Sequence, residues 1–508
     1  MQRRHLALFG FAFTIGLVFS GSSAGCIEPN PNHCYNNNGD AFCAERHPDW
    51  ETAYCTDNSC VDAPNDGCVQ EMPPTECWYC MGGDAGLCDD EDTGTDTTAE
   101  TDTTDVTETT TETETATETE TATETTGPEC VTSDECDGAT PLCDDGSCVA
   151  CGDAVGTSCA DDYPDSPVCD AGSGACVVCT EEDASACPMD APACVDNTCV
   201  PCTMHEQCPG SACELDVGTC FDVEPIHVDG DNMNCGAADG TEANPYCTIG
   251  AAEALIESGM KGVIVVHEAA GSYNESITVS ASGTRVAILA AADETPVWEN
   301  DSGASLRADD GGTVFLHRLV FNGSTNSGVA VTFNGTAYLT RSRISNSNQA
   351  GLTVSNGAAY VRSSSVGVQA VNIPAVSVTS GTVEIVSSTL GAGFGGSASG
   401  IACNSGAGSS VRNSIILTLG AAPEEACSGV ALEGVFLEAD SPDPFDDMSG
   451  WFVDFANGDF HLVANSPVFE TLSTFATWNT GDPIVDIDGD PRVNIDGEAD
   501  FPGADVPN

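Results

Sequence analysis

The chain has 508 residues, of which 80 are Asp or Glu and only 12 are Lys or Arg, so its formal net charge at pH 7 is −68. Nucleic acid and anionic lipid would repel such a chain, which excludes both as partners. A chain of this length has room for several domains.

Residues 1–25 have the layout of an export signal. Arg3 and Arg4 precede an apolar run over residues 6–19, and small residues follow up to Gly25. The run is short for a membrane span, and polar, cysteine-rich sequence follows it directly. We therefore expect an exported protein from which this segment is removed.

The stretch Ser23-Ala-Gly-Cys26 resembles a bacterial lipobox, in which the cysteine is acylated after cleavage, although lipoboxes prefer Leu where Ser23 stands. This resemblance predicts a lipid anchor at Cys26. The protein is then expected to be an outer-membrane lipoprotein, or to lie on the cell surface, of a Gram-negative bacterium, with the anchor as its only membrane contact. Ordinary cleavage after Ala24 is the alternative and would give a secreted protein.

Cysteine counts favour the anchor. The chain has 29 cysteines, and setting Cys26 aside leaves 8 in residues 26–88, 16 in residues 130–220 and 4 beyond. Each block is then even, as paired disulfides require. In the last block we expect Cys235 to pair with Cys247 near the start of the following domain. The remaining two, Cys403 and Cys427, are expected to fasten a loop.

Residues 26–88 form a first cysteine-rich module, and residues 89–129 form a linker of different character. The linker consists mostly of Thr, Glu, Asp and Ala and has no basic residue. Such low-complexity sequence cannot bury enough apolar surface to fold, and its like charges extend it. We predict a disordered stalk, while composition leaves open whether its threonines are glycosylated.

Residues 130–220 divide into four units of four cysteines, which begin at Cys130, Cys151, Cys179 and Cys202. Two residues separate each unit from the next, giving C-x-x-C pairs. Such pairs bind zinc or carry redox chemistry in the cytosol, but in an exported chain they favour a disulfide framework with two bridges per unit. The spacing leaves the connectivity open. The units resemble small cysteine-rich repeats of bacterial surface lipoproteins and, loosely, Dickkopf-type modules.

From Gly312 onward the chain repeats every 22 to 27 residues, with units too short for helical repeats. Aliphatic residues recur at four positions of the repeat. The first column is Leu316, Leu339, Val361, Ile385 and Val411; the second is Phe321, Ile344, Val366, Leu390 and Ile416; the third and fourth begin at Val329 and Val331. Stacking the units at the spacing of paired strands, roughly 4.8 Å, would align each column. The pattern predicts an all-β fold, a single-stranded parallel β-helix.

This solenoid resembles the right-handed parallel β-helices of the pectin-lyase-like superfamily. The resemblance covers about residues 224–508, and the predicted β-helix domain is 221–508. This domain has an N-terminal cap over about 226–260 that includes a short helix from Ile249, and a C-terminal cap over about 451–508. It implies a fold far more than an activity, because one fold hosts many functions.

The superfamily includes pectate lyases, polygalacturonases and pectin methylesterases, but their active-site signatures are missing. Only the methylesterase-like Gly271-Ser-Tyr273-Asn-Glu275 occurs, and we interpret it as a structural turn. We therefore expect a non-catalytic module for binding or adhesion. The alternative is a divergent carbohydrate-active enzyme, either a polysaccharide lyase or a glycoside hydrolase.

Two outward features are candidates for binding an extracellular polysaccharide or a surface protein. Phe315, Tyr338 and Tyr360 precede the first column in successive repeats and form an aromatic ladder, unless a loop or cap covers it. Arg318 and Arg341 share one register and could hold an acidic sugar, or pair with acidic loops.

Asp486, Asp488 and Asp490 alternate as in loops that bind Ca²⁺ through oxygen ligands, although the EF-hand pattern fails at Pro491. Ca²⁺ is therefore a candidate cofactor, and otherwise no cofactor is expected. The alternative is a capping turn over the open end of the solenoid, where exposed strand edges would invite pairing.

Overall fold

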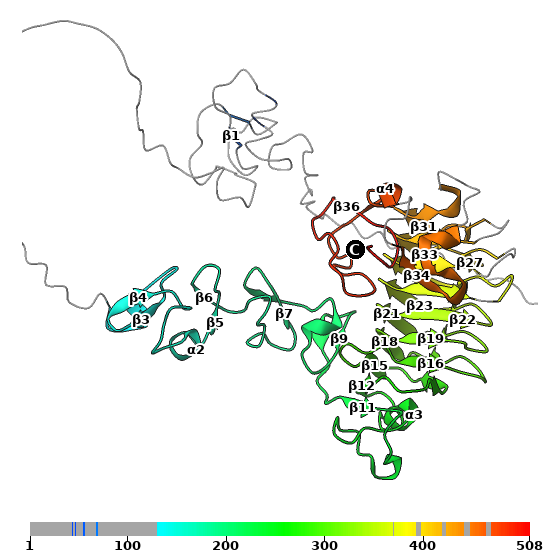
Figure 1. Ribbon diagram of the computed structural model, residues 1–508, viewed down its shortest axis with the longest axis horizontal. Coiled ribbons are helices and arrows are strands. Elements are labelled where there is room, and N and C mark those ends of the chain that lie inside the picture. The colour runs from blue at the N-terminus through cyan, green and yellow to red at the C-terminus, as the bar shows by residue number, and fades with distance from the viewer. Residues whose placement is uncertain are drawn as a thin grey trace, which may run out of the picture. The chain divides into compact units, whose positions relative to one another are not determined.

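A computed structural model (Figure 1) describes residues 130–507 apart from 369, 393–397, 419–422, 441–447 and 464–468, together with Cys43, Arg46, Tyr54, Cys55, Cys68 and Val69. The expectations for the export signal, for Cys26 and for the stalk at 89–129 lie outside these residues. The chain forms two compact parts, Met1–Glu120 and Thr121–Asn508. No helix within the described ranges has the length and apolar character needed to cross a membrane.

In the first part, β1 (Tyr54–Cys55) pairs antiparallel with β2 (Cys68–Val69), and a disulfide joins Cys43 to Cys68. A crosslinked two-stranded pair is consistent with the cysteine-rich module predicted for residues 26–88.

Each of the four cysteine units contains an antiparallel pair of short strands. The pairs are β3 (Leu142–Asp144) with β4 (Ser147–Val149), β5 (Val168–Cys169) with β6 (Cys176–Val177), β7 (Ala193–Val195) with β8 (Thr198–Val200), and β9 (Cys213–Glu214) with β10 (Thr219–Cys220). Short helices precede three of the pairs: η3 (Ser133–Glu135), α2 (Cys159–Asp162) and η4 (His205–Gln207).

In every unit the first cysteine bonds to the third and the second to the fourth. The bridges are Cys130–Cys143 and Cys136–Cys148, Cys151–Cys169 and Cys159–Cys176, Cys179–Cys194 and Cys187–Cys199, and Cys202–Cys213 and Cys208–Cys220. The connectivity that spacing left open is thus uniform, and these cysteines form disulfides rather than a metal site. The crosslinks replace the apolar core that such small units lack.

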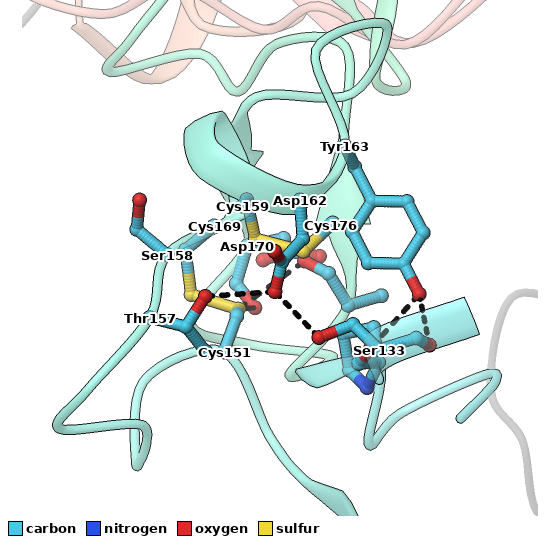
Figure 2. The surroundings of a disulfide bond; sticks show 12 residues. Ser133, Cys151, Thr157, Ser158, Cys159, Asp162, Tyr163, Cys169, Asp170 and Cys176 are labelled. Atoms are coloured by element: carbon cyan, nitrogen blue, oxygen red, sulfur yellow. Dashed lines mark hydrogen bonds between the residues drawn. A yellow bond between two sulfur atoms is a disulfide. The ribbon is translucent and has the colours of Figure 1, made fainter. Parts of the chain in front are cut away.

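Adjacent cysteine units also share polar contacts, as Figure 2 shows around the bridges of the second unit. The Asp162 carboxylate accepts hydrogen bonds from the hydroxyls of Thr157 and Ser133, the latter in the first unit. The Tyr163 hydroxyl donates to the Ser133 carbonyl. The hydrogen bonds from Ser133 and Thr157 hold the Asp162 pKa below its ordinary value. The contacts of Asp162 and Tyr163 with Ser133 join the first two units.

The second part continues as a parallel β-solenoid with three faces, which we call A, B and C. Face A contains β11 (Ile226–Val228), β12 (Lys261–Val266), β15 (Arg285–Ala290), β18 (Thr313–His317), β21 (Thr336–Thr340), β28 (Ser410–Arg412), β31 (Ala431–Glu433) and the C-terminal halves of β23 (Leu352–Arg362) and β25 (Val376–Val386). Each strand on this face before the last one, β31, pairs in parallel with the strand of the next coil.

Faces B and C complete each coil. Face B contains β13 (Tyr273–Asn274), β16 (Val297–Glu299), β19 (Val320–Asn322), β22 (Arg343–Ser347), β24 (Ser365–Val368), β26 (Thr389–Gly391), β29 (Ile415–Leu417) and β32 (Phe436–Leu437). Face C contains β14 (Ile277–Val279), β17 (Leu306–Ala308), β20 (Val329–Thr332), β27 (Ile401–Cys403), β30 (Glu425–Ala426) and the N-terminal halves of β23 and β25. Figure 1 shows the stacked coils edge on.

The predicted aliphatic columns are in register. Leu316 pairs with Leu339, Leu339 with Val361, and the column continues through Ile385 to Val411. All five side chains are fully buried and belong to one core that runs along the solenoid. This confirms the parallel β-solenoid, because each apolar residue is covered only when the next coil stacks on it.

A buried serine ladder supports the corner between faces A and B. The members are Ser342, Ser364, Ser388 and Ser414. The hydroxyls of Ser364, Ser388 and Ser414 each accept the backbone N–H of the serine one coil earlier, and that of Ser342 accepts the N–H of Leu319. All four hydroxyls donate to the carbonyl two residues before them. The ladder therefore satisfies backbone donors at a bend where no strand partner exists.

Helix α3 (Ile249–Glu253) lies at the first coils, beginning at the predicted residue and ending earlier than the pattern suggested. In the solenoid, disulfides join Cys235 to Cys247 and Cys403 to Cys427.

The C-terminal segment contains η6 (Glu438–Asp440), η7 (Met448–Trp451), the pair β33 (Phe452–Asp454) and β34 (Asp459–Leu462), η8 (Phe455–Asn457), α4 (Phe469–Leu472), and the pair β35 (Ala476–Thr477) and β36 (Ala499–Asp500). It packs along the side of the solenoid as well as near its last coils. Phe460 lies against Gly367 and Gly391 of face B, where a Cβ at Gly391 would overlap the ring. The segment therefore contacts several coils, beyond the end cap that the sequence predicted.

Candidate functional site

The aromatic ladder exists on face A. Phe315, Tyr338 and Tyr360 occupy paired positions on β18, β21 and β23. Their rings stack nearly parallel, with centroids 4.9 Å and 4.6 Å apart. Phe315, however, is fully buried, so it offers no ring to a ligand and the expectation for this residue is corrected.

The fourth cysteine unit covers Phe315. Phe221, which directly follows β10, meets the Phe315 ring edge-on at 5.6 Å, and Ala212 completes the cover. These residues pack with Val263 and Ala287 of face A in a small apolar cluster. The first rung of the ladder is therefore covered, as the alternative predicted, but by the fourth cysteine unit and not by a loop or cap of the solenoid.

Buried charge fixes this cover in place. The Glu214 side chain is only 2% exposed, and its two carboxylate oxygens contact Lys261 and Arg285 separately. Arg285 also pairs with Asp216 and lies 5.1 Å from the centre of the Phe315 ring. A buried carboxylate between two cations binds the cysteine unit to the first coils of the solenoid.

Arg318 and Arg341 do occupy one corner of successive coils, and both have left-handed backbone conformations. Arg341 pairs with Glu206 at 2.6 Å and donates to the carbonyls of Ile487 and Asp488. Arg318 has no carboxylate within 4 Å among the described residues and stays half-buried. Arg341 thus pairs with acidic loops, the second of the two roles weighed from sequence.

Two histidines meet beside Arg341. His317 bonds through Nδ1 to Thr340 Oγ1 at 2.9 Å and through Nε2 to Glu206 at 3.0 Å. Burial lowers the pKa of His317, although Glu206 opposes the shift. Burial would raise the Glu206 pKa, but its bond with His317 and the nearby positive charges lower it. The His205 ring lies 5.0 Å from the His317 ring, and burial lowers the pKa of His205 to about 3.

A cavity of about 180 Å³ lies between the fourth cysteine unit, face A and the C-terminal segment. His205 and Met204 line it from the cysteine unit, His317 from β18, and Trp478 and Val485 from the C-terminal segment. We call it the histidine cavity. Its walls are mostly apolar, with a few polar groups at defined positions, as is usual in small-molecule sites.

A second hollow of about 80 Å³ lies beside it and contains the two tyrosines of the ladder. Tyr338 and Tyr360 line it with Leu215, and it shares Arg362 and Thr340 with the histidine cavity. We call it the tyrosine hollow. Burial raises the pKa of Tyr338, so its hydroxyl remains protonated. The tyrosines, unlike Phe315, are only partly covered.

The three aspartates do not converge on a cation site. Asp486 is buried, and one of its oxygens accepts the backbone N–H groups of Asp488, Gly489 and Asp490, while the other accepts that of Val506. Asp488 pairs with His461 at 3.3 Å. The loop is closed by its own amides, which favours the alternative of a capping turn, and Ca²⁺ binding stays a prediction.

The methylesterase-like motif is structural, as interpreted from sequence. The Tyr273 hydroxyl accepts the Gly230 N–H and donates to the His267 carbonyl. The Glu275 carboxylate accepts the N–H groups of Ile249 and Gly250 at the start of α3. Both side chains join the N-terminal cap to the first coil.

His205, Glu206 and Trp478 were not singled out from sequence. Two of them belong to the fourth cysteine unit, which periodicity alone assigns to a separate module. The distribution of charge could have suggested that the fourth cysteine unit contacts the solenoid. No Lys or Arg occurs between Arg46 and Lys261, whereas the coils that follow carry the cations.

Comparison with known proteins reaches only part of the chain. A family of unknown function (DUF8331) matches residues 114–226, which contain the end of the linker and the four cysteine units and stop as the solenoid begins. No curated protein matches the chain. No solved structure matches it either.

Proposed function

We propose that this is an exported, lipid-anchored cell-surface protein whose solenoid, of the right-handed pectin-lyase-like type, is a non-catalytic binding module. The paired disulfides of the described residues are compatible with an extracellular protein. The lipobox-like Cys26 and the acidic stalk at 89–129 favour an anchored module held away from the membrane.

One observation carries the non-catalytic assignment: three arginines of the outer surface are engaged in structural contacts. Arg341 bonds to Glu206 and the C-terminal segment, Arg362 to Glu384 and the Gly481 carbonyl, and Arg412 to buried Asp482. A lyase of this superfamily needs a free Arg or Lys beside a cluster of carboxylates that holds Ca²⁺. Within the described residues, Arg341 and Arg362 each have a single carboxylate within 4 Å, and neither is beside such a cluster.

The tyrosine hollow is the proposed contact surface, and an extracellular polysaccharide is the proposed ligand. Two parallel phenol rings, with the Arg362 guanidinium beside them, offer an apolar face for a sugar ring and donors for its hydroxyls. The net charge of −68 disfavours a strongly acidic polymer, so we expect a neutral one.

The test is a glycan-array screen of the full mature protein, with and without Ca²⁺. We expect a neutral glycan to bind and Tyr360→Ala to weaken it at least tenfold. Phe333→Ala is the matched control, because Phe333 is 64% exposed on another corner of the solenoid and should not affect binding. Binding only to a surface protein, or equal loss in both variants, would contradict this assignment.

Two further measurements test the rest of the proposal. Mass spectrometry of the mature protein should find a diacylated Cys26 at the N-terminus; an unmodified chain starting at Gly25 would contradict the anchor. A polyuronate-cleavage assay should show no turnover. Turnover that Arg318→Ala abolishes would instead establish the carbohydrate-active enzyme.

A further inference from the structure

The tyrosine hollow is divided between two modules of the chain. Thr203 and Leu215 line it from the fourth cysteine unit. Tyr338, Tyr360 and Arg362 are among the residues that line it from face A. A sugar ring that enters the hollow therefore touches the cysteine unit and the solenoid at the same time.

The polar contacts that dock the fourth cysteine unit lie outside the hollow. Glu214 contacts Lys261 and Arg285 with its buried carboxylate. Glu206 contacts Arg341 at 2.6 Å. None of these five residues lines the hollow, so docking can be weakened without removing a group that a ligand there would touch.

Leu215 and Tyr338 belong both to the hollow and to the apolar part of the docking interface. Both pack against the cluster that contains Phe221 and Phe315. Undocking of the cysteine unit separates Leu215 from Tyr338 and so removes one wall of the hollow. A ligand that uses both walls binds the docked form more tightly, and it therefore stabilises that form in proportion to its own saturation.

We propose that a polysaccharide bound at the tyrosine hollow locks the fourth cysteine unit onto face A, so that ligand binding and docking are coupled. This inference rests on the proposed function, because it takes the same ligand at the same hollow, and it adds the regulation of docking by that ligand. Coupling of this kind is reciprocal, so a change that favours undocking also opposes ligand binding. The bound polymer thus keeps the junction between the cysteine units and the solenoid closed.

Oxidation of Phe315 by hydroxyl radicals, measured by mass spectrometry on the full mature chain, tests the coupling. Phe315 is fully buried and does not line the hollow, so a ligand there protects it only by keeping its cover closed. The Glu214→Gln variant is used because weaker docking makes the oxidation measurable. Phe333, which is 64% exposed, is the internal reference that corrects for radicals consumed by the sugar.

The probes are three neutral oligosaccharides, maltohexaose, cellohexaose and laminarihexaose. At ten times its dissociation constant, a probe that binds should lower the oxidation of Phe315 relative to Phe333 by about tenfold. Adding Tyr360→Ala to the Glu214→Gln chain removes one ring of the hollow and should abolish this protection.

The outcomes separate the coupling from the proposed function. Binding of a probe without protection of Phe315 would overturn the coupling and leave polysaccharide binding in place. Protection that persists in the Tyr360→Ala chain would place the ligand outside the hollow and overturn both. Failure of all three probes to bind would also overturn both.

Discussion

Replacing Glu214 by Gln should release the fourth cysteine unit from face A. The Glu214 side chain is 2% exposed and contacts two cations, of which Arg285 is itself only 19% exposed. Breaking a buried, hydrogen-bonded charge pair costs about 2–5 kcal/mol. Gln keeps the shape and one acceptor oxygen, so we expect the lower part of that range, about 2–3 kcal/mol.

Oxidation of Phe315 by hydroxyl radicals measures the release. Phe315 is fully buried under Phe221 and reacts only in molecules whose cover has opened. A loss of about 2–3 kcal/mol raises the open population roughly 30- to 150-fold. The disulfides Cys202–Cys213 and Cys208–Cys220 keep the released unit folded, so the oxidation rate reports docking rather than unfolding.

Glu384→Gln is the matched control. Glu384 also pairs with an arginine, Arg362, but the two side chains are 40% and 38% exposed. Exposed pairs contribute little, so this variant should change stability by about 0.5 kcal/mol or less and leave Phe315 oxidation unchanged. Equal oxidation of Phe315 in the wild type and in Glu214→Gln would show that Glu214 does not hold the fourth cysteine unit on face A.

Three other predictions concern the ends of the solenoid. Glu275→Ala removes both acceptors at the start of α3 and should destabilise the first coils by about 1–2 kcal/mol, measured by hydrogen exchange; an unchanged exchange rate would contradict this. Bonds to Asp459 and then Asp488 raise the pKa of His461 to about 10, above its unfolded value of 6.5. The stabilisation of the fold by protonated His461 is therefore complete below pH 6.5 and lost as the pH rises through 10. An NMR titration of the His461 ring should show a midpoint near 10, and a midpoint near 6.5 would contradict this prediction. Replacing Cys403 and Cys427 together by Ser opens a loop of 24 residues and should lower the free energy of unfolding by about 3 kcal/mol. Proteolysis between the two positions should then be faster than in the wild type, and equal cleavage rates would contradict this prediction.

The tyrosine hollow could be anticipated only in part from sequence. The period of the repeat placed Phe315, Tyr338 and Tyr360 on one face, because identical register positions must stack. It did not reveal that Phe221 closes the first rung, since the covering unit has a different period and lies almost 100 residues earlier in the chain. The spacing of the aspartates likewise suggested a cation, whereas the backbone amides around Asp486 occupy its carboxylate.

The solenoid could be predicted from the amino-acid sequence alone, because a buried column such as Leu316, Leu339 and Val361 requires a fixed repeat and therefore leaves a periodic pattern in the chain. Between Cys130 and Cys427 the even cysteine blocks likewise predicted the number of bridges. The connectivity within each four-cysteine unit and the surface that stays open followed only from the three-dimensional contacts. Those outcomes depend on contacts between segments of different period, such as Glu214 with Arg285 and Glu206 with His317, and non-periodic contacts of this kind leave no repeat to read.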